Sequence, residues 1–162
     1  MVRRVRSLLL MTTFLLLPVA ANAQGAGVQA VVVGQNPGVR QDAQLVVPSG
    51  ETWEVLTIFA ELITGATAGT RQATLQIEVG GVGMVVWHSD APGDQQAGQT
   101  RRYVAGAGLP RQDEGAAATF NTKQWALPAG LLLTGGSVIG TLTFGMQATD
   151  DWTELRVVVR KY

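Results

Sequence analysis

The chain contains no cysteine and only one histidine, His88, among its 162 residues. Without cysteine there are no disulfides and no lipid-modified cysteine, so the folded protein depends on its core alone. One imidazole and no thiol also exclude the usual ligand sets of a zinc site. We therefore expect neither a metal nor a cofactor.

The chain has no excess of positive or negative charge, since 12 basic residues balance 12 acidic ones. A protein that binds nucleic acid needs a basic face to neutralise phosphates. The composition therefore gives no support for a nucleic-acid partner.

The first 23 residues have the three regions of a secretory signal peptide. Three arginines precede an apolar run from Leu8 to Leu17, which ends at Pro18. Ala21-Asn22-Ala23 then has the small-x-small pattern that signal peptidase reads. The run is also shorter than the roughly 20 residues of a membrane span. We predict cleavage before Gln24 and export to the periplasm or out of the cell.

Residues 24–162 have the size of a single domain that can bury a real core without disulfides. Residues 1–23 contain three arginines and no acidic residue, so their removal leaves a mildly acidic mature chain. No later apolar segment is long enough to span a membrane as a helix.

Alternation of apolar and polar residues with a period of two runs through the mature chain, and no helical periodicity of useful length interrupts it. Gly- and Pro-rich turns separate the segments. We predict an all-β fold, a two-sheet antiparallel β-sandwich that is jelly-roll-like. The expected strands cover residues 28–33, 43–47, 52–62, 71–79, 82–88, 101–104, 119–127, 131–133, 137–146 and 152–160.

The expected strand at 52–62 differs from the others because neither of its alternating faces is purely polar. It is therefore either central in a sheet or changes face at a bulge. The strand at 71–79 has the cleanest alternation, and Gly80-Gly81 predicts a hairpin turn after it.

Candidate catalytic residues are few. His88, Ser89 and Asp90 are consecutive, whereas the members of a catalytic triad converge from separate segments. The acidic pairs Asp113-Glu114 and Asp150-Asp151 lie in expected turns, where adjacent acids usually face water. Structural calcium and a carboxylate pair for glycoside hydrolysis are the alternatives, although no spaced calcium-loop pattern is present. We predict no catalytic residues and no enzyme.

Trp87, Trp125 and Trp152 are the candidate ligand-stacking residues. Exposed indoles on a secreted β-sandwich can stack on the apolar face of a sugar. The alternative is that each of them packs at the edge of the core. Trp53 alternates with Val55 and Phe59, which is typical of a core position.

Most of residues 45–160 resemble small β-sandwich proteins encoded in the structural regions of bacteriophages and prophages. The resemblance lies in Pro48-Ser49-Gly50 with Trp53, in the loop that ends at Gly69-Thr70-Arg71, and in Leu127-Pro128-Ala129-Gly130. It includes the late turn in which Gly145, Gln147, Asp150 and Trp152 recur. The resemblance implies a virion or appendage component that assembles through its surface.

Two functions follow as hypotheses. The first is an exported, non-enzymatic structural or assembly module that contacts copies of itself or other structural proteins. Its contacts would use weakly charged β faces and the loops at 64–71 and 105–116. The second is a secreted carbohydrate-binding module that uses exposed tryptophans.

Overall fold

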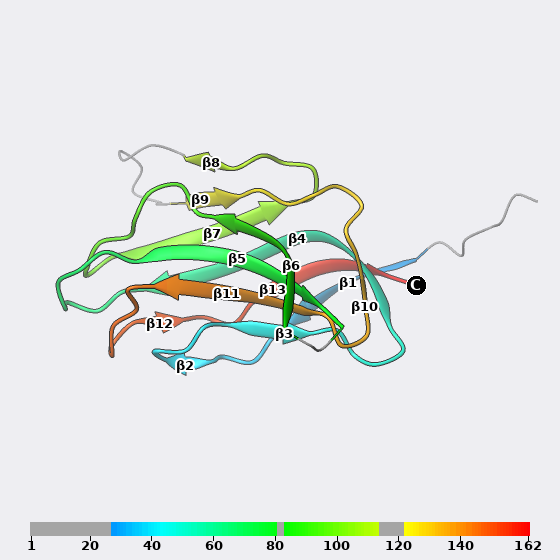
Figure 1. Cartoon of the computed structure of the whole chain (residues 1–162), viewed down its shortest axis with the longest axis horizontal. Helices are drawn as coiled ribbons and strands as arrows, with labels where there is room; N and C mark the ends of the chain where they lie inside the picture. Colours follow the sequence, from blue (N-terminus) through cyan, green and yellow to red (C-terminus); the bar gives the residue numbers. More distant parts are fainter. Residues whose placement is uncertain (1–26, 81–82, 114–121) are drawn as a thin grey trace, which may run out of the picture.

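The computed structural model describes residues 27–80, 83–113 and 122–162. Within these ranges the chain forms strands and no helix, so no helix there could cross a membrane. The predicted signal peptide, residues 1–23, lies outside the described residues. The strands, shown in Figure 1, are β1 (Val28–Val33), β2 (Gly38–Val39), β3 (Gln44–Val46), β4 (Thr52–Ile63), β5 (Gln72–Val79), β6 (Met84–Asp90), β7 (Thr100–Gly106), β8 (Gln112–Asp113), β9 (Thr122–Trp125), β10 (Leu132–Thr134), β11 (Val138–Phe144), β12 (Asp151–Trp152) and β13 (Arg156–Lys161).

Two sheets make up the fold, and the predicted all-β class is confirmed. The large sheet has the order β1-β13-β4-β7-β9-β8, with β10 and β12 also paired to β4 and β2 paired to β12. The small sheet has the order β3-β11-β5-β6. In Figure 1 the small sheet lies in front of the large one, which gives a sandwich-like arrangement.

The pairing is antiparallel everywhere except between β7 and β9, which run parallel. The predicted arrangement of two antiparallel sheets is confirmed, with this one parallel pair as an exception. A parallel pair needs a connection of about a dozen residues or more. The connection from Gly106 to Thr122 is long enough to return the chain to the start of β7.

Strand β4 is central, because β13 pairs with one side of it and β7 and β10 with the other. Its register with β13 shifts between Val158 and Val159. On β4 the buried positions change phase at the same place, from Trp53 and Val55 to Ile58. The central place and the bulge were alternatives for residues 52–62, and the structure has both, since a bulge adds one residue and reverses the faces.

The core fills the space between the two sheets. The small sheet contributes buried residues such as Leu75, Ile77 and Ile139, and the large sheet contributes Ile58 and Val157. These side chains alternate along their strands with more exposed ones, as one-sided burial of a strand requires.

The last predicted strand, at 152–160, is instead two strands, β12 and β13. Trp152 and Leu155 are both fully buried although they are three positions apart, which breaks the period of two. Between them the N–H of Thr153 donates to the carbonyl of Glu61, 2.8 Å away. That bond continues the register of β12 with β4. The next residues lie outside the strands, and alternating burial resumes at Leu155 and continues through Val157 and Val159.

Candidate functional site

Two of the three candidate stacking tryptophans lie inside the core. Trp125 and Trp152 are 0% exposed, and the ring of Tyr103 lies against both, at centroid distances of 4.9 and 5.3 Å. Their indole N–H groups donate to the carbonyl of Ala73 and the hydroxyl of Thr143. Both indoles are thus packed and hydrogen-bonded within the protein, as buried tryptophans usually are. Neither presents a face to a sugar in this structure.

Trp87 is half-buried on β6 and packs against the core. Trp53 is fully buried, and its indole N–H donates to the carboxylate of Glu51. The three candidates Trp87, Trp125 and Trp152 consequently do not form one exposed platform. Of the three, Trp87 alone offers part of its surface to solvent.

His88, Ser89 and Asp90 alternate across the small sheet. His88 is exposed, and Asp90 accepts a hydrogen bond from the hydroxyl of Thr74 over 2.7 Å. Ser89 is buried, and its Oγ accepts the backbone N–H of Ala126. The serine is therefore separated from its two neighbours by the sheet, and the three side chains do not converge.

The acidic pair Asp150-Asp151 is largely withdrawn from water. Asp150 is 0% exposed, and Asp151 is half-buried in β12. The expectation that both acids are solvated is wrong, because Asp150 has a partner that no local pattern reveals. Asp113 forms part of β8, and Glu114 lies outside the described residues. Among residues 27–80, 83–113 and 122–162, no group of three or more His, Cys, Asp or Glu could hold a metal ion.

The partner of Asp150 is Arg71, which is also 0% exposed. Arg71 Nε lies 2.7 Å from Asp150 Oδ2, and Nη2 lies 3.0 Å from Oδ1. The backbone N–H groups of Gly65 and Gln147 donate to the same carboxylate. Burial would raise the pKa of Asp150, but the hydrogen bonds from Arg71, Gln147 and Gly65 outweigh it and hold that pKa below its usual value. The carboxylate is therefore ionised at neutral pH.

The other guanidinium N–H groups of Arg71 hold the loop before it. Nη1 donates to the carbonyl of Gly69 and Nη2 to that of Thr67, over 2.6 and 3.0 Å. The loop at 64–71 and the turn at 145–152 are thereby joined through one buried ion pair. The structure thus brings together two segments that are far apart along the chain.

A second buried polar side chain, Gln95, contacts the hydroxyl of Tyr103, whose ring lies against Trp125 and Trp152. Gln95 is 0% exposed, and its Nε2 donates to the carbonyls of Leu62 and Gln99, both 2.9 Å away. Its Oε1 accepts the hydroxyl of Tyr103 over 2.8 Å. Burial raises the pKa of Tyr103, so this hydroxyl keeps its proton and remains a donor. The side chain of Gln95 thus has each of its polar atoms satisfied.

A hollow of about 360 Å³ lies on the outer face of the small sheet. Its polar lining consists of Thr74, Gln76, His88 and Asp90, and its apolar lining includes Leu142 and Phe144. Register pairs place Gln76 between His88 on β6 and Gly140 on β11. Because Gly140 has no side chain, a depression forms in the surface of the sheet at this position. We name this feature the sheet hollow.

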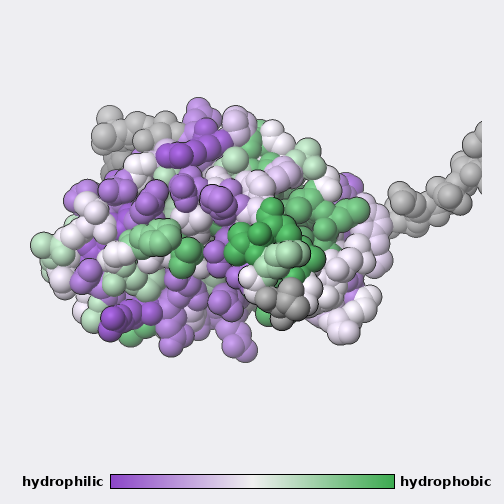
Figure 2. Space-filling model, viewed as in Figure 1, coloured by the Kyte–Doolittle hydropathy of each residue, from purple (hydrophilic) through white to green (hydrophobic). Residues whose placement is uncertain are grey.

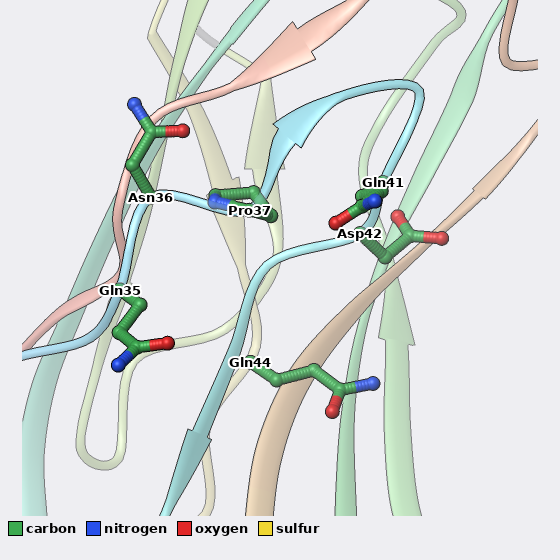
Figure 3. Close-up of a pocket in the computed structure, with 6 residues that line it drawn as sticks. All are labelled: Gln35, Asn36, Pro37, Gln41, Asp42 and Gln44. Atoms are coloured by element: carbon green, nitrogen blue, oxygen red, sulfur yellow. The ribbon is translucent and has the colours of Figure 1, made fainter.

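A second hollow, of about 550 Å³, lies where the chain passes between β1 and β3. Figure 3 shows its lining side chains. Four of them are amides, and one carboxylate, Asp42, is present. Asp42 Oδ1 accepts the hydroxyls of Thr141 and Thr143, over 3.1 and 2.8 Å. The lining residues are Gln35, Asn36, Pro37, Gln41, Asp42 and Gln44. This lining contains no pair of carboxylates of the kind that glycoside hydrolysis uses.

Apolar side chains also lie exposed on the outer face of the small sheet. Val46, Val85 and Phe144 expose 53%, 45% and 57% of their surfaces, and Leu142 exposes 37%. The register places Val46 beside Val138, and Val138 and Val85 on either side of Glu78. Figure 2 shows hydrophobic side chains gathered over β6, with hydrophilic ones around them. We call the set Val46, Val85, Leu142 and Phe144 the apolar face.

Sequence reasoning did not identify the sheet hollow or the apolar face. Both depend on which strands are neighbours, and β11 and β5 are far apart along the chain. Comparison of the chain with protein-family models, with curated proteins and with solved structures found no match.

Proposed function

We propose that this protein is an exported, non-enzymatic structural or assembly module with a jelly-roll-like sandwich. It would act after removal of residues 1–23, and it would contact copies of itself or other structural proteins. The resemblance of residues 45–160 to phage and prophage structural proteins supports this assignment. So do the absence of cysteine and the single histidine, which leave little for catalysis.

The apolar face carries the proposal. Clusters of exposed apolar side chains on a folded protein usually mark a contact surface. Four such side chains lie on the outside of the four-stranded sheet, where Glu78 and Asp90 are the nearby acids. Covering this face with another protein would remove apolar surface from water with few charges to desolvate.

The test is the mass of the purified protein by light scattering over a wide range of concentration. We expect mass to increase with concentration, and we expect the double substitution Leu142→Ser and Phe144→Ser to weaken this increase. The matched control is Val39→Ser with Leu132→Ser, which changes two exposed apolar residues of the large sheet. A monomer at every concentration, with no partner on the apolar face, would contradict the proposal.

A carbohydrate-binding function is the second candidate, and the sheet hollow favours it. The exposed ring of Phe144 could stack on a sugar, while Gln76, His88 and Asp90 could donate or accept hydrogen bonds with hydroxyl groups. In this form of the carbohydrate-binding hypothesis, Phe144 is the stacking residue in place of Trp125 and Trp152.

A panel of glycans, screened by calorimetry, tests this second candidate. Binding that is lost in Phe144→Ala and kept in Leu132→Ala would favour it. Leu132 is a suitable control because it is 59% exposed and lies on β10 of the large sheet. The absence of heat with every glycan would count against it.

A further inference from the structure

The edges of the two sheets differ in how well they are protected. Natural sheets blunt their edges with short strands, bulges or charges, because an open edge pairs with other chains. Here β2 and β8 have two residues each, and β3 and β10 have three. The longer edge strand β6 carries Asp90, and its register with β5 shifts between Ile77 and Glu78.

Strand β1 has none of these protections among the described residues. Its six residues, Val28 to Val33, include no charge and no proline. It pairs with β13 along its whole length in one unbroken register, and nothing pairs with its other side. Val28, Val31 and Val33 expose 70%, 65% and 54% of their surfaces. A long, uncharged and apolar edge strand of this kind is able to pair with a strand of another chain.

The backbone groups on the free side of β1 can be assigned from the ladder. The N–H of Gly34 donates to the carbonyl of Leu155, 2.8 Å away, which continues the register of β1 with β13. In an antiparallel ladder, alternate residues direct both backbone groups to the same neighbour. Val28, Ala30 and Val32 therefore bond to β13. Gln29, Val31 and Val33 direct their N–H and C=O groups away from the protein.

We propose that β1 pairs antiparallel with β1 of a second copy of this chain, so that the large sheet continues across a twofold axis at Val31. In this register Val31 lies opposite Val31 of the other copy, and Gln29 lies opposite Val33. All the outward backbone groups of these three residues then find partners. This inference rests on the proposed assembly function and specifies one of its contacts.

The side chains suit self-pairing. On the face that Gln29, Val31 and Val33 share, the facing pairs are valine with valine and valine with glutamine, so no like charges meet. On the inner face Ala30 would lie opposite Val32, and both already pack against the core. A strand edge that complements itself fits the isologous contact of a twofold dimer.

Charges beside β1 do not oppose the contact. Two arginines of the adjacent β13 share the outer face, paired in register with Gln29 and Val33. Arg160 lies 2.6 Å from a carboxylate oxygen of Glu54, and Arg156 lies 2.6 Å from one of Glu154. Both positive charges are thus compensated within one copy.

The first experiment measures the dimer Kd of the purified protein and of Val31→Lys by sedimentation equilibrium. Like charges directly opposite one another in a ladder are destabilising, and two lysines would meet on the axis. We expect Kd to rise about tenfold or more in Val31→Lys. The matched control is Leu132→Lys, at a leucine that is 59% exposed on the three-residue strand β10 and outside the apolar face, and it should leave Kd unchanged.

The second experiment mixes Val31→Lys with Val31→Glu. If Val31 lies opposite its own copy, each variant alone is weakened, and the mixture forms a mixed dimer at least as tight as the original. Urea unfolding of each variant ensures that a loss of association is not a loss of folding, since Val31 is mostly exposed.

Four outcomes would overturn the inference. Unchanged association of Val31→Lys, or a mixture that fails to recover, would exclude self-pairing at Val31. If Leu142→Ser with Phe144→Ser weakens association while Val31→Lys does not, the assembly function stands and the β1 contact is wrong. If the original protein stays monomeric throughout, the β1 contact is wrong, and the assembly function then requires a different protein on the apolar face.

Discussion

Arg71 and Asp150 form an ion pair in which both side chains are 0% exposed. The pair joins the loop at 64–71 to the turn at 145–152, and backbone N–H groups of Gly65 and Gln147 complete the coordination of the carboxylate. A buried pair of this kind contributes less to net stability than its distances suggest, because desolvation opposes the attraction. Breaking it, however, leaves one charge buried without a partner.

Asp150→Asn should destabilise the protein by about 3–5 kcal/mol, because it leaves Arg71 buried and uncompensated. Urea unfolding measures the change. The control is Glu154→Gln, which removes the partner of the exposed Arg156 and should change little. The double substitution Arg71→Met with Asp150→Leu should recover only the part of the loss that comes from the unpaired charge, because the N–H groups of Gly65 and Gln147 still lose their acceptor. Equal effects of the Asp150 and Glu154 substitutions would contradict the buried pair.

Stability should fall at acidic pH through Asp150. Its folded pKa lies below the unfolded value of about 3.9, so the carboxylate contributes stability above that value. This contribution is lost as pH falls through the lower folded pKa. Urea midpoints between neutral and strongly acidic pH should therefore decline less steeply in Asp150→Asn than in the original protein. Parallel curves would exclude a lowered pKa.

Tyr103→Phe should cost about 1–3 kcal/mol, because Gln95 Oε1 would lose its donor while remaining buried. The ring itself is kept, so the contacts of this ring with Trp125 and Trp152 are unchanged in this variant. Thermal unfolding measures the effect. A stability equal to that of the original protein would mean that Gln95 finds another donor.

Tryptophan fluorescence should report three shielded indoles and one partly accessible one. Trp53, Trp125 and Trp152 are 0% exposed, whereas Trp87 is half-buried. Iodide should quench only a minor part of the emission, and Trp87→Phe should remove that part. Strong quenching that persists in Trp87→Phe would place Trp53, Trp125 or Trp152 at the surface, and exposure of Trp125 or Trp152 would support the stacking hypothesis.

Gly145→Ala should be more destabilising than Gly130→Ala. Both glycines have positive φ, at +77° and +67°, where a side chain costs about 1–2 kcal/mol. A methyl group at Gly145 would also collide with the carbonyl oxygen of Thr70, whereas nothing lies within 4 Å of one at Gly130. Urea unfolding of the two variants separates the collision from the backbone strain. Equal losses would argue against the close approach of the two segments.

Local pattern predicted much of the fold because strand formation and one-sided burial repeat every two residues. The alternation at 71–79 gave β5, and the mixed faces at 52–62 indicated the central, bulged β4. The alternation did not predict the strand boundaries where burial is not periodic, as at Thr153 to Leu155. It also did not predict very short strands such as β2.

The sites were harder to predict than the strands. Asp150 was expected to face water because its neighbours in sequence are polar, yet its partner Arg71 is far away along the chain. Trp125 and Trp152 gave no local sign of whether they would be exposed. Both rings contact Tyr103 on β7, and β7 is far from β12 along the chain.

Sequence by itself determined that this chain folds as strands on a cysteine-free core, because side-chain alternation and composition are local properties. Tertiary structure alone decided which charges are buried, which tryptophans are enclosed and which edge stays open. Those outcomes depend on contacts between residues far apart in the chain. The difference is clearest in β1, whose valines predict a strand, while only the sheet order leaves one side of that strand unpaired.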